Sequence, residues 1–275
     1  MIEIDQLNGV KKFRMARSFW GRGVYFTTSY WIDGLVVDTG CAYTVNDLLS
    51  ALDNLPVRLV INTHCHEDHM GGNAAIQSKY RVKVMVHSPA IPMLTTPRKR
   101  HRLHLYRKFM WGYPAPFQAS RLGDRVETEN HRFEVIHTPG HSADHICLYE
   151  ATKGWIFTGD AYIGGRDRAL RRDYDIWQII ASLKEIAGRD PNVLFPGSGH
   201  VRMRPKKEIL QKIEYLDELG ERILTLHEKG LSNRKIRKLL LGREMRVAYL
   251  TMGHFSGVNL VNSYLTNRPD TQVSG

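Results

Sequence analysis

The sequence predicts an α/β fold with a largely buried sheet, followed by a small helical extension. Short apolar runs rich in Val, Ile, Phe, Tyr and Trp recur through residues 1–200, and each is bounded by Gly, Asp or Pro. Such runs are typical of strands. Segments with the apolar spacing of amphipathic helices lie between them, and after Pro205 only the helical spacing remains. We therefore expect one α/β domain over residues 1–205 and a helical extension over 206–275.

Eight segments have the length and composition of strands. In chain order they are residues 23–32, 34–40, 57–64, 82–89, 133–140, 145–150, 155–160 and 192–199. Three segments between them have helical spacing, namely residues 44–55, 72–80 and 175–188. Asn46 is the expected N-cap of the first of these helices.

The extension should hold three helices. Residues 206–229 form one amphipathic segment that ends at Gly230, and a second helix begins after Ser232 and ends at Gly242. The third covers residues 257–265. One stretch of the first domain, residues 88–120, follows no clear period; it is basic, aromatic and dotted with prolines, and we interpret it as an insert.

Composition and charge narrow the class of protein. Three cysteines cannot supply a disulfide framework, the N-terminus has acids where a signal peptide needs bases, and no apolar run approaches the ~20 residues of a spanning helix. We expect a cytoplasmic protein without a membrane span. Residues 70–122 contain ten Lys or Arg and no Asp or Glu, so this stretch accounts for +10 of the net charge of +11.

Metal-type side chains follow four of the expected strands. The segment "THCHEDHMGG" at residues 63–72 holds His64, His66, Asp68 and His69, and three further candidates follow later strands. These are His141, Asp160 and His200. Ligand sites gather at strand ends in α/β sheets, because the loops there converge over a rigid base. Three imidazoles and a carboxylate so close together have little structural purpose without a cation.

The donor types indicate a catalytic site. A structural zinc site is closed by four ligands, usually with several cysteine sulfurs, whereas these seven candidates are all nitrogen or oxygen donors. Seven donors suit two ions that share a carboxylate. Zinc fits this set best, with iron or manganese as alternatives. Two such ions about 3.5–4 Å apart lower the pKa of a shared water from 15.7 to roughly 7, giving hydroxide at neutral pH. Cys65, between two ligand histidines, is expected to point away.

The ordered motifs "HCHEDH", "TPGHSADH", "FTGDAY" and "PGSGH" resemble the signature of the metallo-β-lactamase superfamily. The resemblance implies a four-layer αβ/βα sandwich with the metals at one edge. It also implies that one metal is held by His64, His66 and His141, that the other is held by Asp68, His69 and His200, and that Asp160 bridges both. Asp68 would orient the nucleophile or pass a proton to the leaving group. Asp38 and His145 are candidates for orienting the ligands.

Within the superfamily the residues resemble the glyoxalase II-like hydrolases. β-Lactamases of the best-known type have Cys at the Asp160 position, and flavodiiron proteins have Glu at the His66 position. We therefore expect a dinuclear hydrolase that uses a bridging hydroxide on an anionic small-molecule ester or thioester. The alternatives are a nuclease or phosphodiesterase acting on RNA or single-stranded nucleic acid, and a nucleic-acid-binding module with a secondary metal site.

Two basic segments leave their roles open. Residues 98–108, "RKRHRLHLYRK", are either a solvated face or a cationic lid that draws an anionic substrate to the metals. The second cluster lies in the extension and comprises Arg234, Lys235, Arg237, Lys238, Arg243 and Arg246. We interpret that extension as a cap that shapes the pocket, with a winged-helix-like, nucleic-acid-binding element as the alternative.

Overall fold

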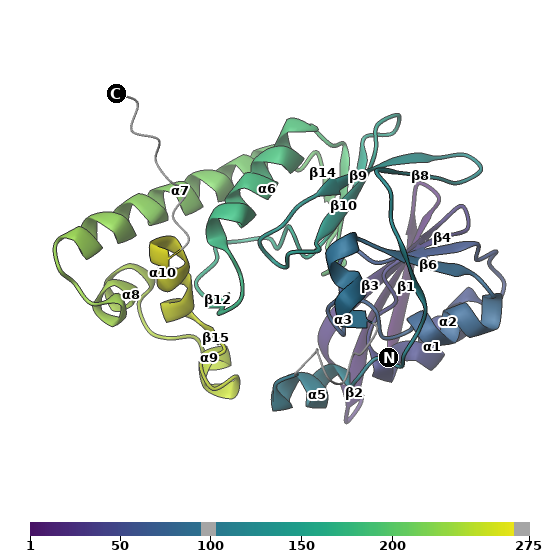
Figure 1. Cartoon of the computed structure of the whole chain (residues 1–275), viewed down its shortest axis with the longest axis horizontal. Helices are drawn as coiled ribbons and strands as arrows, with labels where there is room; N and C mark the ends of the chain where they lie inside the picture. The colour runs from purple at the N-terminus through teal and green to yellow at the C-terminus, as the bar shows by residue number, and fades with distance from the viewer. Residues whose placement is uncertain (95–102, 267–275) are drawn as a thin grey trace. The chain divides into compact units, whose positions relative to one another are not determined.

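Two stacked β-sheets organise the first part of the fold in the computed structural model, which describes residues 1–94 and 103–266 (Figure 1). The first sheet has seven strands in chain order: β1 (Ile2–Leu7), β2 (Val10–Phe19), β3 (Arg22–Ile32), β4 (Leu35–Val37), β5 (Leu59–Ile61), β6 (Lys83–Val86) and β7 (Ala119–Arg121). Strands β1 to β4 pair antiparallel, and β4 to β7 pair parallel. The carboxyl ends of β4 and β5 therefore lie side by side.

The second sheet has six strands in the order β14-β13-β11-β10-β9-β8. Their bounds are β8 (Arg125–Glu127), β9 (Arg132–His137), β10 (Ile146–Glu150), β11 (Trp155–Gly159), β13 (Val193–Pro196) and β14 (Arg202–Met203). Only the β11–β13 pair is parallel. Asp160 and the loop that carries His200 thus follow two neighbouring strands at the same sheet edge.

The main core lies between the two sheets. It joins buried side chains of the first sheet, such as Tyr30 and Ile61, to buried side chains of the second, such as Phe157 and Phe195. The rings of Phe157 and Phe195 stack with centroids 4.8 Å apart, and the Tyr30 hydroxyl donates to the Pro196 carbonyl at 2.6 Å. Burial of these large side chains fixes the sheets on which the site is built.

A second apolar cluster joins the outer face of the first sheet to two helices, α1 (Val45–Leu52) and α2 (Asn73–Tyr80). The expected N-cap of α1 is wrong by two residues: Thr44 is the N-cap, and Asn46 lies inside the first turn. The reason is the 3-10 turn η1 (Ala42–Thr44), which runs directly into the helix.

The insert at residues 88–120 contains short helices and a strand that its sequence did not predict. They are η2 (Ser88–Ala90), α3 (Ile91–Leu94), α5 (Leu105–Trp111) and β7. Each of the eight expected strand segments contains an observed strand, whereas β1, β2 and five described strands of two or three residues lie outside these segments. β1 and β2 mix charged with apolar residues, so neither presents an apolar run.

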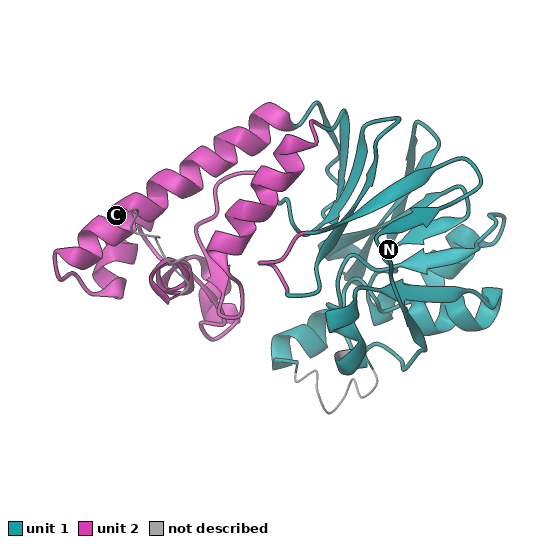
Figure 2. Ribbon diagram, turned by 45° about the horizontal axis from the view of Figure 1, so that its top comes forward, with its two compact units in different colours: residues 1–137, 143–163, 191–205 teal, residues 138–142, 164–190, 206–275 magenta. Residues whose placement is uncertain are grey.

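The chain divides into two compact units, which Figure 2 colours separately. The second unit comprises residues 138–142, 164–190 and 206–275, and its described elements extend to residue 266. They are β12 (Leu170–Arg171), α6 (Ile176–Gly188), α7 (Lys206–Glu228), α8 (Asn233–Leu241), α9 (Arg246–Leu250), β15 (Phe255–Ser256) and α10 (Gly257–Thr266). The helices expected after Pro205 are confirmed as α7, α8 and α10.

Tyr264 is the central side chain of the second unit. It is fully buried, and its hydroxyl donates to the Leu216 carbonyl at 2.7 Å. Gly220 permits the approach, because a Cβ there would lie 2.8 Å from the Tyr264 ring. None of the helices within residues 1–94 and 103–266 combines the length and apolarity needed to cross a bilayer.

Candidate metal centre

The histidine motif occupies the loop between β5 and α2, and hydrogen bonds from its surroundings hold this loop in shape. The carbonyl of His69 accepts from the backbone N–H of Thr39 at 2.7 Å and from the Asn62 amide at 2.9 Å. Asn73, the first residue of α2, donates to Asn62 at 2.6 Å. Gly71 is required by close approach, since a Cβ there would lie 2.2 Å from the carbonyl carbon of Cys41.

Two overlapping groups of ligand atoms result. One joins His64, His66 and His141, and the other joins His64, His69 and Asp160. Within each group the ligand atoms all lie within 4.8 Å of one another. The four histidines are buried, Asp160 is half-buried, and His64 belongs to both groups. Nε2 of His64 and Nδ1 of His66 approach to 2.8 Å.

Asp38, a predicted orienting residue, contacts two residues of the loop. Its backbone has a positive φ of 58°, at the end of β4, and its carboxylate is buried. One oxygen accepts the Thr63 backbone N–H at 2.7 Å, and the other lies 2.7 Å from the Thr63 hydroxyl and 2.8 Å from Nδ1 of His69. The contact fixes the ring so that Nε2 of His69 is the nitrogen nearest Asp160.

A hydrogen bond from its backbone N–H holds Asp160 in place, and Gly197 leaves room for its carboxylate. The N–H of Asp160 donates to Nε2 of the fully buried His145 at 3.2 Å, so this imidazole contacts the backbone of a predicted ligand. One carboxylate oxygen lies 3.4 Å from Nε2 of His69. Gly197, which follows β13, faces this carboxylate: a Cβ there would lie 2.4 Å from Oδ1 of Asp160.

Asp68 and His200 are placed differently from the other five predicted ligands. Asp68 is buried 4.0 Å from Nε2 of His69, but neither ligand group includes it. Burial raises the pKa of Asp68 to about 6; His69 opposes this shift, and the charges of Glu67 and Asp160 add to it. His200 is exposed and, among the described residues, belongs to neither group.

Burial and two neighbouring carboxylates shift the pKa of the His69 imidazole in opposite directions. Burial lowers the pKa of His69, but Asp160 and Asp38 raise it and prevail, so that its pKa lies well above the usual value. A dication bound beside these carboxylates would displace that proton, because a metal ligand must be deprotonated.

Tyr174 is a contact that the sequence did not reveal. Its hydroxyl lies 3.2 Å from Nε2 of His141, and the two ring centroids are 4.4 Å apart. Tyr174 lies just before Asp175, whose carboxylate caps α6 by accepting from the N–H groups of Trp177 and Gln178. No local pattern distinguishes this tyrosine from the eleven others in the chain.

Cys65 points away from the ligands, as expected. It packs in an apolar cluster with Met70, Val86, Ala90 and Leu94. Burial raises the pKa of this thiol well above its ordinary value. The thiolate needed for metal binding is therefore disfavoured, and neither ligand group contains a cysteine.

Glu67 forms a buried ion pair with Arg107 on α5. Two guanidinium nitrogens of Arg107 each meet one carboxylate oxygen of Glu67. The two side chains are 6% and 0% exposed. Arg107 is one of the six basic residues in the segment 98–108, and its charge is buried and neutralised by Glu67. For this residue the lid hypothesis is wrong, because a buried, paired guanidinium cannot attract a distant substrate.

The remaining basic residues of that segment divide between two cases. Arg98, Lys99, Arg100 and Arg102 lie outside the described residues. Lys108 belongs to α5, which is docked at its backbone: the Lys108 carbonyl accepts from the Tyr43 hydroxyl at 3.1 Å, and the Phe109 carbonyl accepts from Arg17. The Arg17 guanidinium also lies over the rings of Tyr43 and Phe109, at 4.1 and 4.8 Å.

The donor set fits divalent metal ions. Imidazole nitrogens with carboxylate oxygens suit zinc, iron or manganese, and the carboxylate of Asp38 beside His69 is the kind of partner that metal-bound histidines use. Four buried imidazoles converging within one site have no apolar packing role that would account for them.

Comparison with known proteins places this site in a family. The model of the Metallo-beta-lactamase superfamily matches residues 22–198. A hydroxyacylglutathione hydrolase of Thermosynechococcus vestitus is 31% identical over 109 residues, which are 40% of this chain and 36% of that protein. A thioesterase of Emericella nidulans is 27% identical over 209 residues, which are 73% of this chain and 53% of that protein.

Among solved structures, a beta-lactamase domain protein from Burkholderia ambifaria superposes with a TM-score of 0.69 at 20% identity, covering 96% of this chain and 87% of that one. At this identity the likeness shows the fold alone, and it confirms the expected α/β sandwich with helical extension. The chain spans 31 to 53% of the length of the curated relatives compared with it. The family match extends over more than half of the chain and includes the whole histidine motif, His141 and Asp160. The chain belongs to the metallo-beta-lactamase superfamily.

Proposed function

We propose that this chain is a dinuclear metal-dependent hydrolase of small anionic thioesters or esters. The observation that carries the proposal is the pair of overlapping, buried ligand groups that share His64. A single tetrahedral ion with an open position needs three protein ligands, whereas these groups together offer five residues, with Asp68 nearby. We assign zinc as the metal, because its catalytic sites are built from His and carboxylate donors.

Each ligand has a proposed place. His64, His66 and His141 would hold one ion, Asp68, His69 and His200 would hold the other, and Asp160 would be available to both. His200, which is exposed in the structure, would have to turn toward the other donors to take this place. Divalent ions bound there would supply a hydroxide nucleophile near neutral pH and would polarise the scissile carbonyl.

The residues around the proposed ions orient the ligands and exclude bulk water. Asp38 fixes the ring of His69, and His145 fixes the backbone of Asp160. Asp68 is the residue that we propose to orient the nucleophile or to pass a proton to the leaving group, because its buried carboxylate lies 4.0 Å from Nε2 of His69, at the edge of the ligand groups. Burial of the loop keeps bulk water from competing for the donors.

The substrate class rests on the relatives. Two of them are named for hydrolysis of thioesters, as hydroxyacylglutathione hydrolase and as thioesterase. A thioester offers an activated carbonyl and a thiolate leaving group, which need little help beyond a nucleophile and carbonyl polarisation. The excess of basic residues between the histidine motif and Gly123 favours an anionic substrate.

The test begins with metal content. Protein purified without chelator should contain two metal equivalents per chain, and saturation at one would contradict the dinuclear assignment. The same preparation is assayed on a hydroxyacyl-glutathione thioester, on the matching oxygen ester and on single-stranded RNA. Turnover of the thioester or ester supports the proposal, and cleavage of the RNA alone overturns it.

Asp160→Asn tests the proposed ligand role of Asp160. Glu127→Gln, which makes the corresponding change at an exposed carboxylate of β8, is its control. Removing a residue that supports a metal ligand lowers metal affinity or activity about 10–100-fold. Asp160 is itself a proposed ligand, so we expect Asp160→Asn to lower metal affinity by about 100-fold or more. It should bind less than two equivalents while keeping its melting temperature in the presence of chelator. Glu127→Gln should retain both metals and full turnover.

A further inference from the structure

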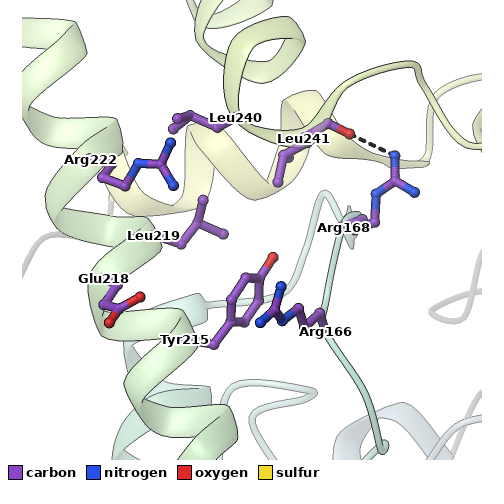
Figure 3. A pocket seen from close by; sticks show the side chains of 8 residues that line it. All are labelled: Arg166, Arg168, Tyr215, Glu218, Leu219, Arg222, Leu240 and Leu241. Carbon is purple, nitrogen blue, oxygen red and sulfur yellow. Dashed lines mark hydrogen bonds between the residues drawn. The ribbon is translucent and has the colours of Figure 1, made fainter.

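A basic cavity lies within the second unit, built from residues that the metal centre does not use. Its volume is about 220 Å³, and Figure 3 shows the side chains that line it. They come from the loop after Ile163, from α7 and from the end of α8, and are Arg166, Arg168, Tyr215, Glu218, Leu219, Arg222, Leu240 and Leu241. Pockets for drug-sized ligands measure about 300–1,000 Å³, so this cavity suits a smaller molecule.

Two arginines of the cavity have no acidic partner. Within residues 1–94 and 103–266, neither Arg166 nor Arg222 forms an ion pair, and Glu218, the one acid in the lining, is not within 4.0 Å of either. In Figure 3 the guanidinium of Arg222 extends from α7 and that of Arg166 lies beside the Tyr215 ring, 5.3 Å from its centroid. Guanidinium groups without a carboxylate are sites where an anion gains the most.

The loop that carries Arg166 is fixed before any ligand arrives. The Tyr215 hydroxyl donates to the Asp167 carbonyl at 2.8 Å, and Lys212 pairs with the Asp167 carboxylate at 2.9 Å. Arg168 donates to the Leu241 carbonyl at 2.6 Å, which joins the same loop to the end of α8. A preorganised loop does not have to be ordered on binding, so less free energy is lost.

The lining of the cavity is both charged and apolar. Leu219 and Leu241 are buried and Leu240 is half-buried, and Figure 3 shows Leu219 between Arg222 and Arg166, so these leucines offer hydrocarbon surface beside the arginines. The charges of three arginines and one glutamate give the lining a net charge of +2. A phosphate monoester carries about −1.5 to −2 at pH 7, whereas a carboxylate carries −1, so the monoester matches this charge better.

We propose that this cavity is a second ligand site, which binds a phosphate monoester with a small aromatic or apolar body. Arg166 and Arg222 hold the phosphate, and the leucines contact the organic body. Tyr215 lies beside Arg166 and keeps its hydrogen bond to the Asp167 carbonyl, which holds the loop in place. The site is separate from the proposed hydrolase reaction and does not depend on it.

The field at Tyr215 supports the arrangement. Burial and the Asp167 carboxylate raise the pKa of this phenol, and Arg166, Arg168 and Arg222 each lower it. All three guanidinium groups are therefore close enough to act on a single point in the cavity.

Calorimetry with phenyl phosphate as the probe tests the site in the full chain. The double variant Arg166→Gln/Arg222→Gln should bind phenyl phosphate at least tenfold more weakly than the unmodified chain. The control is Lys207→Gln/Arg234→Gln, which removes the same charge from exposed positions of α7 and α8 outside the cavity. Its affinity should change less than twofold. Inorganic phosphate should bind at least tenfold more weakly than phenyl phosphate, because it lacks the body that contacts the leucines.

Three results would overturn the proposal. Equal weakening in both double variants would show a diffuse field rather than a site. Equal affinity for phosphate and phenyl phosphate would show that the leucines do not contact the organic body of the ligand. Binding that survives in Arg166→Gln/Arg222→Gln would place the ester elsewhere, including at the metal centre, and would leave the proposed hydrolase untouched. Circular dichroism of both double variants confirms that each is folded.

Discussion

Replacing Arg107 by methionine should destabilise the first unit by a large and measurable amount. The change removes the guanidinium from a carboxylate that is 0% exposed, and the guanidinium itself is 6% exposed. Water therefore cannot screen or solvate the Glu67 charge that remains. Breaking a buried ion pair by removing one partner costs about 3–5 kcal/mol, which for a domain of this size corresponds to roughly 6–20 °C in melting temperature.

The assay is calorimetric melting in the presence of chelator, so that differences in metal binding do not contribute to the melting temperature. Arg58→Met is the matched control. Arg58 pairs with Glu129 at 2.9 Å, but these side chains are 60% and 66% exposed, so its loss should cost no more than about 1 kcal/mol. The double variant Glu67→Met/Arg107→Met should recover most of the stability, because it leaves no buried charge.

Two results would refute this reasoning. A melting temperature for Arg107→Met equal to that of Arg58→Met would show that the pair is hydrated and worth no more than a surface contact. A double variant as unstable as the single variant would show that Arg107 stabilises through packing of its side chain rather than through its charge.

Three further predictions concern the metal centre. Gly197→Ala should lower metal affinity, because its Cβ would lie 2.4 Å from a carboxylate oxygen of Asp160; Gly123→Ala, with open space around it, should not, and chelator competition measures both. Asp38→Asn should weaken metal binding about 10–100-fold by releasing the ring of His69, and unchanged affinity would show that the 2.8 Å contact does not orient the ligand. Chelator should lower the melting temperature of the unmodified chain, since a metal present at about 1,000 times its Kd adds about 4 kcal/mol, and a melt insensitive to chelator would argue against a bound metal.

Local patterns predicted the parts of this structure that local chemistry decides. The apolar runs located the central strands, and the motif around His64 identified the ligand loop, because both signals lie within a few consecutive residues. The Glu67–Arg107 pair joins residues 40 positions apart, and a basic run in sequence gives no sign that one member is buried. Tyr174 was missed for the same reason, since its contact with His141 spans 33 positions.

The polar contacts beneath the histidine loop have a consequence for how metal enters. Thr39 and Asn62 hold the loop at the carbonyl of His69, and Gly71 sets it tightly against the backbone of Cys41. In a zinc finger the ion creates the fold, so that affinity for metal and stability of the chain are the same quantity. Here the contacts that shape the loop come from the polypeptide itself. We therefore expect loss of metal to lower the stability of this chain without unfolding it.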